Sequence, residues 1–228
     1  MDYGEGKYFV FSKEVIKNAI GENIFFQNIK DALGSAQNGN FSTMVHLTFN
    51  TKERPKGFYE LKKELLKTRS LLKYPFIDKK INTAWNALMI EALYRASVID
   101  KNYIEKADKH MSALKDFMFE RGGLCHQSLL GHKPKQLGFL EDYSFMISAL
   151  IAGYEVTFDE KKLKFAEYLL SRAKSKFYKD GIWYLSDDNL KIKADLVDIH
   201  YISPLSKMIQ NIIKLASLKQ SRKYEKIA

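Results

Sequence analysis

Two adjacent carboxylates, Glu141 and Asp142, stand at the start of an otherwise apolar run, GFLEDYSFMISALI (138–151). Paired carboxyl groups are what glycosidic chemistry uses, and the type of reaction depends on their spatial separation. Acids in the first turn of a helix also bind free backbone amides and suit the helix dipole. Capping is the favoured role of this pair, while ligand binding and acid–base catalysis stay open. Asp142 is the first residue to test as a catalytic acid or base, followed by Glu141.

Polar residues also stand at the heads of two other apolar segments. Asn86 lies in the first turn of the segment 84–99, and Asp198 and His200 precede the segment 204–218. If equivalent helix ends gather at one mouth, their partial positive charge favours anionic or hydroxyl-rich ligands there. The expected ligand-binding residues are Tyr143, Trp85, Asn86, Asp78, Lys79, Asp198 and His200. By residue type Trp85 is first expected in the core, although an aromatic ring beside a sugar-sized cavity can stack on a ligand.

Motifs for metals, cofactors and nucleophilic catalysis are absent from the sequence. No histidine has an H-x-x-x-H partner, so we expect no zinc site. His126 lies in a turn-rich segment and is expected to be a surface or hydrogen-bonded histidine. The single cysteine, Cys125, excludes a disulfide within the chain and is expected to be a small buried residue. Without a P-loop, a dinucleotide glycine fingerprint or G-x-S-x-G, we expect no cofactor.

The elements that position these residues form an internal repeat of about 58 residues. Each unit has an apolar helix, an amphipathic helix and a turn-rich segment that suggests a short β-hairpin. The first unit covers 84–99, 103–119 and the segment after it, and the second covers 139–156, 160–177 and 179–193. A third unit begins at 204–218.

A unit of this kind cannot bury its apolar helix alone, so the units must stack side by side. Either an open superhelix or a closed ring of helical hairpins would satisfy that requirement. Because the apolar helices are apolar on nearly every side, we favour an inner ring inside an outer ring of lysine-bearing helices. We expect one domain over 1–228, with an irregular part at 1–83, the repeats at 84–218 and a basic tail at 219–228.

The composition bounds the class of protein. The 228 residues are 46% apolar and carry a net charge of +10. Most of the positive residues are lysines on amphipathic helices, so a solvated outer face explains the charge better than nucleic-acid binding. No apolar run is long enough to span a membrane. We therefore expect a cytoplasmic protein that binds neither nucleic acid nor membrane.

Several ordered motifs resemble the YyaL-type family, the bacterial relatives of the spermatogenesis-associated thioredoxin-like protein. DKKINTAWNALMIEAL (78–93) resembles its D-D-K-x-x-x-x-W-N-G-L-M-I-x-A-L signature, and GFLEDYSFMISALI (138–151) resembles G-x-L-E-D-Y-A-x-x-I-x-A-L-I. EGKYFVFSKEVIKNAIG (5–21) resembles the stretch that follows the family's thioredoxin-like domain. The sequence departs from the pattern at Ile77 and Ala87, where the family has Asp and Gly.

The resemblance implies a mainly α fold, an (α/α) toroid of six-hairpin glycosidase type with short β-hairpins between helix pairs. It also implies that a thioredoxin-like domain and further hairpins lie outside this chain. Two hypotheses follow. The first is a carbohydrate-binding or carbohydrate-processing toroid, similar to glycosidases or sugar epimerases if it is an enzyme. The second is a non-catalytic scaffold that partners a thioredoxin-like domain or self-associates through an incomplete ring.

Overall fold

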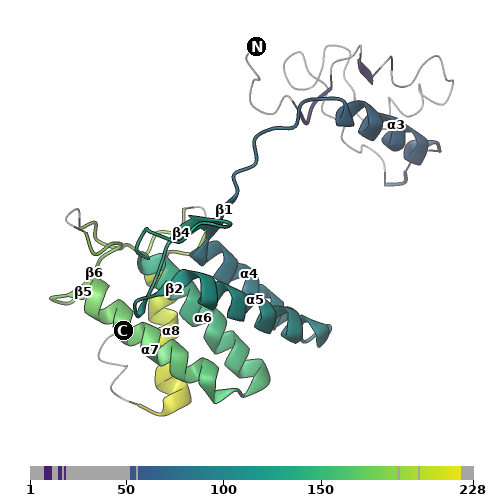
Figure 1. Cartoon of the computed structure of the whole chain (residues 1–228). Helices are drawn as coiled ribbons and strands as arrows, with labels where there is room; N and C mark the ends of the chain where they lie inside the picture. Colours follow the sequence, from purple (N-terminus) through teal and green to yellow (C-terminus); the bar gives the residue numbers. More distant parts are fainter. Residues whose placement is uncertain are drawn as a thin grey trace. The chain divides into compact units, whose positions relative to one another are not determined.

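The computed structural model of the chain describes residues 8–11, 15–16, 18, 52–54, 56–188, 191–199 and 201–221. It divides into two compact units, residues 1–78 and 79–228, which are described one by one (Figure 1). In the first unit, α3 (Phe58–Ser70) buries Leu61 and Leu65 and carries basic residues in its last turn. The expectation of a single domain over 1–228 stays a prediction. None of the helices in the described part of the chain is long and apolar enough to cross a membrane.

The second unit has two layers of helices (Figure 1). Its described helices are α4 (Thr83–Ala96), α5 (Asn102–Met118), α6 (Leu140–Thr157), α7 (Glu160–Phe177) and α8 (Pro204–Lys219). The apolar helix α6 packs against both α4 and α8, while the amphipathic helices α5 and α7 pack on α4 and α6. The predicted inner row of apolar helices and outer row of amphipathic helices is therefore confirmed.

Short antiparallel pairs of strands connect the layers. β1 (Lys80–Asn82) pairs with β4 (Gln127–Leu129), β2 (Phe119–Glu120) with β3 (Gly123–Leu124), and β5 (Tyr178–Lys179) with β6 (Ile182–Trp183). The last two pairs are the predicted hairpins.

The two hairpins turn in the same way. The central residues of the first turn, Arg121 and Gly122, have φ of 52° and 75°, and those of the second, Asp180 and Gly181, have 52° and 80°. Two successive positive φ values are typical of the two-residue type I′ turn, whose twist matches that of the strands it joins.

Backbone hydrogen bonds repeat with the same period. The N–H of Cys125 donates to the carbonyl of Met118 at 2.8 Å, and the N–H of Tyr184 donates to that of Phe177 at 2.8 Å. The inner helices α4 and α6 are also anchored at their starts, each by the hairpin segment of its own unit. Thr83 N donates to the His126 carbonyl and Leu140 N to the Leu185 carbonyl, each at 2.9 Å. The hairpin segments therefore set where the polar heads of the inner helices lie.

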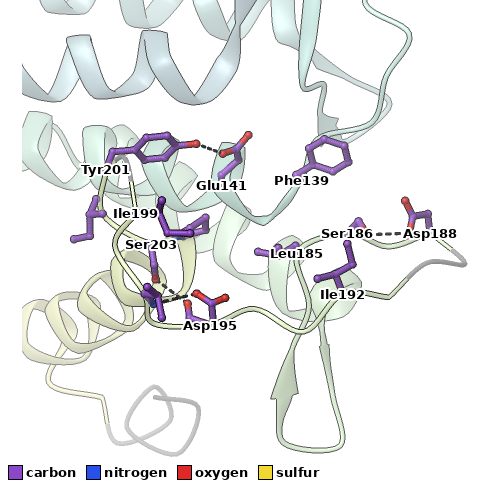
Figure 2. A pocket seen from close by; sticks show the side chains of 13 residues that line it. Phe139, Glu141, Leu185, Ser186, Asp188, Ile192, Asp195, Ile199, Tyr201 and Ser203 are labelled. Atoms are coloured by element: carbon purple, nitrogen blue, oxygen red, sulfur yellow. Dashed lines mark hydrogen bonds between the residues drawn. The ribbon is translucent and has the colours of Figure 1, made fainter.

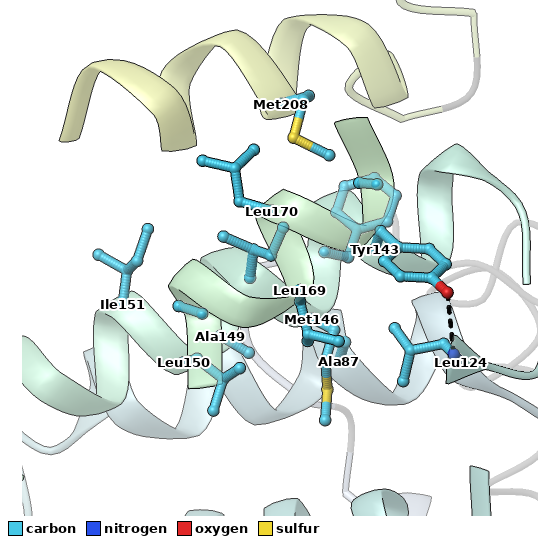
Figure 3. Close-up of a cluster of buried hydrophobic side chains, with 14 of the residues drawn as sticks. Ala87, Leu124, Tyr143, Met146, Ala149, Leu150, Ile151, Leu169, Leu170 and Met208 are labelled. Atoms are coloured by element: carbon cyan, nitrogen blue, oxygen red, sulfur yellow. Dashed lines mark hydrogen bonds between the residues drawn. The ribbon is translucent and has the colours of Figure 1, made fainter. Parts of the chain in front are cut away.

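The core centres on α6, which is buried on nearly every side (Figure 3). Its side chains pack against α4, α7 and α8, so an apolar residue at almost any position of the helix lies in the core. The same expectation for α4 is wrong on one face, where Trp85 and Met89 are 64% and 62% exposed. Within the described residues α4 packs mainly against α5 and α6, which leaves that face open.

Candidate functional site

Asp142 lies in the first turn of α6 and is completely buried. One carboxylate oxygen accepts the Phe139 N–H at 2.8 Å, which is the capping role expected for an acid at this place. The other accepts the Ala84 N–H of α4 at 3.1 Å, so the same carboxylate joins the heads of two inner helices. Capping thus explains the bonds of Asp142 to backbone N–H groups, and its remaining hydrogen-bond partner is a histidine.

His126 brings an imidazole to this buried acid. Its Nδ1 lies 3.0 Å and 3.3 Å from the two oxygens of Asp142, and its side chain is 13% exposed. While Asp142 is ionised it can only accept a hydrogen bond, so Nδ1 carries the proton and Nε2 is left as an acceptor. The side-chain amide of Asn82 approaches Nε2 at 3.4 Å. The resulting Asp142–His126 pair is held in one orientation from both ends.

Glu141 is the acid that faces outward. Its side chain is 19% exposed, and one oxygen lies 3.7 Å from Nδ1 of His126. The other oxygen accepts a hydrogen bond of 2.7 Å from the hydroxyl of Tyr201, a residue 60 positions further along the chain (Figure 2). Two adjacent carboxylates therefore have different environments, since Asp142 is enclosed and Glu141 is open to a ligand.

Burial and hydrogen bonding shift the ionisation of these groups. The hydrogen bond to Asp142 raises the pKa of His126 above its usual 6.5, and this effect outweighs the opposing effect of burial. Burial raises the pKa of Asp142 to about 6, because it outweighs the hydrogen bonds and the charge of His126. Burial and the bond to Glu141 raise the pKa of Tyr201 to about 12, so the phenol keeps its proton and donates.

These shifts predict a pH dependence of stability. The pKa of His126 is raised in the folded state, so the protonated imidazole stabilises the fold fully below pH 6.5 and this stability is lost as the pH rises through the folded pKa. The raised pKa of Asp142 also stabilises the fold at low pH, and this contribution is lost as the pH rises through about 6. We expect the free energy of unfolding, measured in urea between pH 5 and pH 9, to fall more steeply in the wild type than in Asp142→Asn, which removes both the carboxyl group with the raised pKa and the partner that raises the pKa of His126. A His110→Gln variant, altered at an exposed histidine, should keep the wild-type slope. Equal slopes in Asp142→Asn and the wild type would contradict the pairing.

Tyr143 lies in the core of the second unit. It is completely buried, and its hydroxyl oxygen accepts the Leu124 N–H at 3.0 Å (Figure 3). Its ring packs edge-on against Phe177, with 5.4 Å between ring centroids. The structure therefore places this predicted ligand residue between α6 and the first hairpin.

Removing the hydroxyl of Tyr143 should destabilise the fold. In Tyr143→Phe the buried Leu124 N–H loses its acceptor, and we expect a loss of about 1–3 kcal/mol in the free energy of unfolding. The matched control is Tyr168→Phe, which removes a phenol that donates to the Gly122 carbonyl at the surface. That control should stay within about 0.5 kcal/mol of the wild type. Equal losses in the two variants would refute the assigned role.

Trp85 and Asn86 both lie at the head of α4, on its solvent side. The side chain of Asn82 caps this helix by accepting the Trp85 N–H at 3.0 Å, and the amide of Asn86 donates to the Asn82 carbonyl at 2.7 Å. Trp85 is thus an exposed ring beside the site, and the first expectation that it is a core residue is wrong. The open face of α4 is the physical reason.

The other predicted ligand residues do not join this cluster within the described structure. Asp78 and Lys79 are exposed and fall on the two sides of the boundary between the units. Asp198 is exposed and accepts the Ser203 N–H at 2.6 Å, which shapes the turn before α8. His200 lies outside the described residues.

A pocket of about 510 Å³ opens beside Glu141 (Figure 2). One side is formed by Phe139 and Glu141 at the head of α6, and the other by residues within 185–188, 192–199 and 201–204, in the segment that leads to α8. Tyr201 belongs to this segment, so its bond to Glu141 also ties the segment to α6. The size lies within the roughly 300–1,000 Å³ common for small-molecule sites.

The cluster also has donor atoms that a cation could use. His126, Glu141 and Asp142 each offer one ligand atom, and these atoms lie within 4.8 Å of one another. Hydrogen bonds already account for both oxygens of Asp142 and for Nδ1 of His126. The sequence-based expectation of no metal site stays a prediction.

Two members of the cluster were not among the predicted site residues, His126 and Tyr201. His126 lies 16 positions before Asp142 in a hairpin segment, and no motif spacing connects the two. The repeat carried a usable signal, because the segment after an outer helix must reach the head of a neighbouring inner helix.

Comparisons with known proteins give the fold. No protein-family model matches the chain. The uncharacterized protein B0495.5 of Caenorhabditis elegans is 25% identical over 190 residues, which are 77% of this chain and 26% of that protein. The chain therefore spans about a quarter of the length of this curated relative.

The solved structures that are similar at low sequence identity include three carbohydrate-related enzymes. Cellobiose 2-epimerase from Bacillus thermoamylovorans has a TM-score of 0.55 and 14% identity, with 68% of this chain and 44% of that chain covered. The GH76 α-mannanase BT2949 from Bacteroides thetaiotaomicron has a TM-score of 0.53 and 16% identity, with 73% of this chain and 47% of that chain covered. A D-mannose isomerase has a TM-score of 0.52 and 13% identity, with 87% of this chain and 47% of that chain covered. The expected fold class is thus confirmed: the chain is mainly helical, with the (α/α) toroid architecture of six-hairpin glycosidase-like enzymes.

Proposed function

We propose that the second unit binds and processes a neutral, sugar-like ligand at the head of α6. Glu141 would face the ligand, and the buried pair Asp142–His126 would stand behind it. One observation carries this proposal: two neighbouring carboxylates are split into a buried one paired with histidine and an open one at the mouth of a 510 Å³ pocket.

The chemistry of this arrangement suits hydroxyl-rich molecules. The Glu141 carboxylate accepts hydrogen bonds, the Tyr201 phenol donates one, and the exposed Trp85 ring offers an apolar face at the head of the neighbouring helix. His126 can exchange a proton near neutral pH, since the hydrogen bond to Asp142 raises its pKa above the usual 6.5. If the protein is an enzyme, Glu141 and His126 are the groups that would move protons, and Asp142 would position His126.

The similar structures support this class of ligand. Their names identify an epimerase of cellobiose, an α-mannanase and an isomerase of D-mannose. The motifs that resemble the YyaL-type family support a relationship of this chain to the toroid portion of that family. This relationship is also a proposal.

A panel of neutral sugars tests the proposal. Isothermal titration calorimetry with glucose, mannose, cellobiose and mannobiose should find at least one ligand for the wild type. Glu141→Gln should weaken its binding about 10- to 100-fold, the effect of losing a hydrogen bond to a charged group. Glu155→Gln, on the same helix but paired with Lys214 at the surface, should bind as the wild type does. No binding of any sugar, or equal affinity in Glu141→Gln, would overturn the proposal.

A scaffold role is the second candidate, and the open face of α4 favours it. Trp85 and Met89 are both more than 60% exposed on this face, as a surface that docks a partner would be. The partner would be a thioredoxin-like domain or a second copy of the chain. Light scattering at rising protein concentration tests the second copy: a dimer that Met89→Ser disrupts would support this role, and a monomer at all concentrations would contradict it.

A further inference from the structure

The pocket beside Glu141 has an apolar wall that the proposed sugar site does not use. Ile192, Val197 and Ile199 line it and are 61%, 62% and 75% exposed. Leu185 and Ile202 line it as well, and Figure 2 shows Leu185, Ile192 and Ile199 around the same space. Exposed apolar side chains that gather in one concave site favour an apolar ligand group, because covering them removes their surface from water.

The charge of the residues that line the pocket restricts the class of ligand further. Glu141, Asp188 and Asp195 all line the pocket, and its described lining includes no lysine, arginine or histidine. A carboxylate or phosphate on the ligand would meet like charges here, which opposes binding. The lining therefore opposes anionic sugars and leaves neutral ones, the class that the proposed function names, although the chain as a whole carries a net charge of +10.

The polar and apolar parts lie in one cavity. Tyr201 reaches from the chain before α8 to Glu141 at the head of α6 (Figure 2), and the apolar Ile192, Val197 and Ile199 of the same stretch of chain line the same pocket. A free sugar would cover only the polar part, and an alkane would leave the carboxylate without a hydrogen-bond partner from the ligand. A molecule with one polar and one apolar end covers both.

We propose that this pocket takes an uncharged glycoside with an apolar aglycone. The aglycone lies against Ile192, Val197 and Ile199, and the sugar faces Glu141. This inference rests on the proposed function and adds the class of ligand to it.

A chain-length series is the first test. The affinities of methyl, butyl, hexyl and octyl glucoside are measured by calorimetry on the full chain, below the micelle concentration of each compound. Affinity should rise about threefold to fourfold per added methylene until the wall is covered, since burial of a methylene contributes roughly 0.8 kcal/mol. Equal affinity of methyl and octyl glucoside would overturn the inference.

Matched variants locate the aglycone. Ile199→Ser shortens an exposed apolar side chain of the pocket, so it should leave the thermal unfolding midpoint near that of the wild type. It should weaken the affinity for octyl glucoside at least fivefold and the affinity for methyl glucoside less than twofold. Ile213→Ser, at a 56% exposed position of α8, is the control and should change neither affinity. Equal losses of octyl glucoside affinity in the two variants would place the aglycone elsewhere and overturn the inference.

A pair of ligands that differ in one charge completes the test. Phenyl glucoside should bind at least tenfold more tightly than phenyl glucuronide, which carries a carboxylate. The reverse order would contradict the inference. If cellobiose binds as tightly as octyl glucoside and Glu141→Gln weakens both, the aglycone site is wrong while the proposed function stands. If no glycoside and no free sugar binds, the proposed function fails, and this inference fails with it.

Discussion

Replacing Asp142 with leucine should lower the free energy of unfolding by about 3–5 kcal/mol, the cost of removing one partner from a buried ionic pair. The carboxylate accepts hydrogen bonds from the backbone N–H groups of Ala84 and Phe139, and it also contacts His126. Asp142 is fully buried. Leucine has a similar size but no acceptor, so these donors would be left without partners. The loss is large against the 5–15 kcal/mol that a domain of this kind has in total.

Two further variants separate this effect from a general sensitivity of the region. Asp142→Asn keeps one acceptor oxygen, so it should lose less, about 1–3 kcal/mol. Glu141→Gln changes the adjacent, partly exposed carboxylate and should stay within about 0.5 kcal/mol of the wild type. Urea unfolding at pH 7, followed by circular dichroism, measures all three. A loss below 1 kcal/mol in Asp142→Leu would contradict the assignment of Asp142 as the residue that joins α4, α6 and the hairpin segment.

Phe177→Ala should have an effect of similar size, about 3–5 kcal/mol, because it removes a large ring from a closely packed core. Phe177 is the last residue of α7 and is completely buried. Its ring packs edge-on against Tyr143 of α6, and its carbonyl accepts the Tyr184 N–H of the second hairpin. The ring therefore joins the outer helix α7 to the inner helix α6, so a cavity here would loosen the packing between the two layers.

Phe158→Ala is the control for this variant. Phe158 follows α6 with φ of 53° and is 75% exposed, so its ring contributes little burial. We expect a change within about 0.5 kcal/mol, as for most exposed positions. If Phe177→Ala and Phe158→Ala had the same unfolding midpoint in urea, the packing of α7 described above would be wrong.

The repeat could be predicted from the sequence because its physical signals are local. The apolar spacing of 160–177 matches α7, and the segment 139–156 differs from α6 by one residue at each end. The hairpins follow from Gly122 and Gly181, since their turns need positive φ, which glycine adopts without strain. The exposure of Trp85 could not be predicted, because it depends on which helix covers each face of α4 and the helix itself is apolar nearly all round.

The candidate site was predictable only in part. The position of Glu141 and Asp142 at a helix head was visible in the sequence, and so was the capping role that Asp142 shows. Their division into a buried and an open acid depends on the contacts of Ala84 and His126, which both belong to the preceding unit of the repeat. Tyr201 is equally distant in sequence from Glu141, so only the stacking of the units brings the two together.

A crystal structure of the protein with octyl glucoside would show whether the Glu141 carboxylate recognises a sugar at the head of α6. We expect a glucosyl hydroxyl within hydrogen-bonding distance of Glu141, with the alkyl chain against Ile192 and Ile199. Glucoside bound only at another surface, or a Glu141 carboxylate still bonded to Tyr201 with no sugar beside it at saturating ligand, would contradict this expectation.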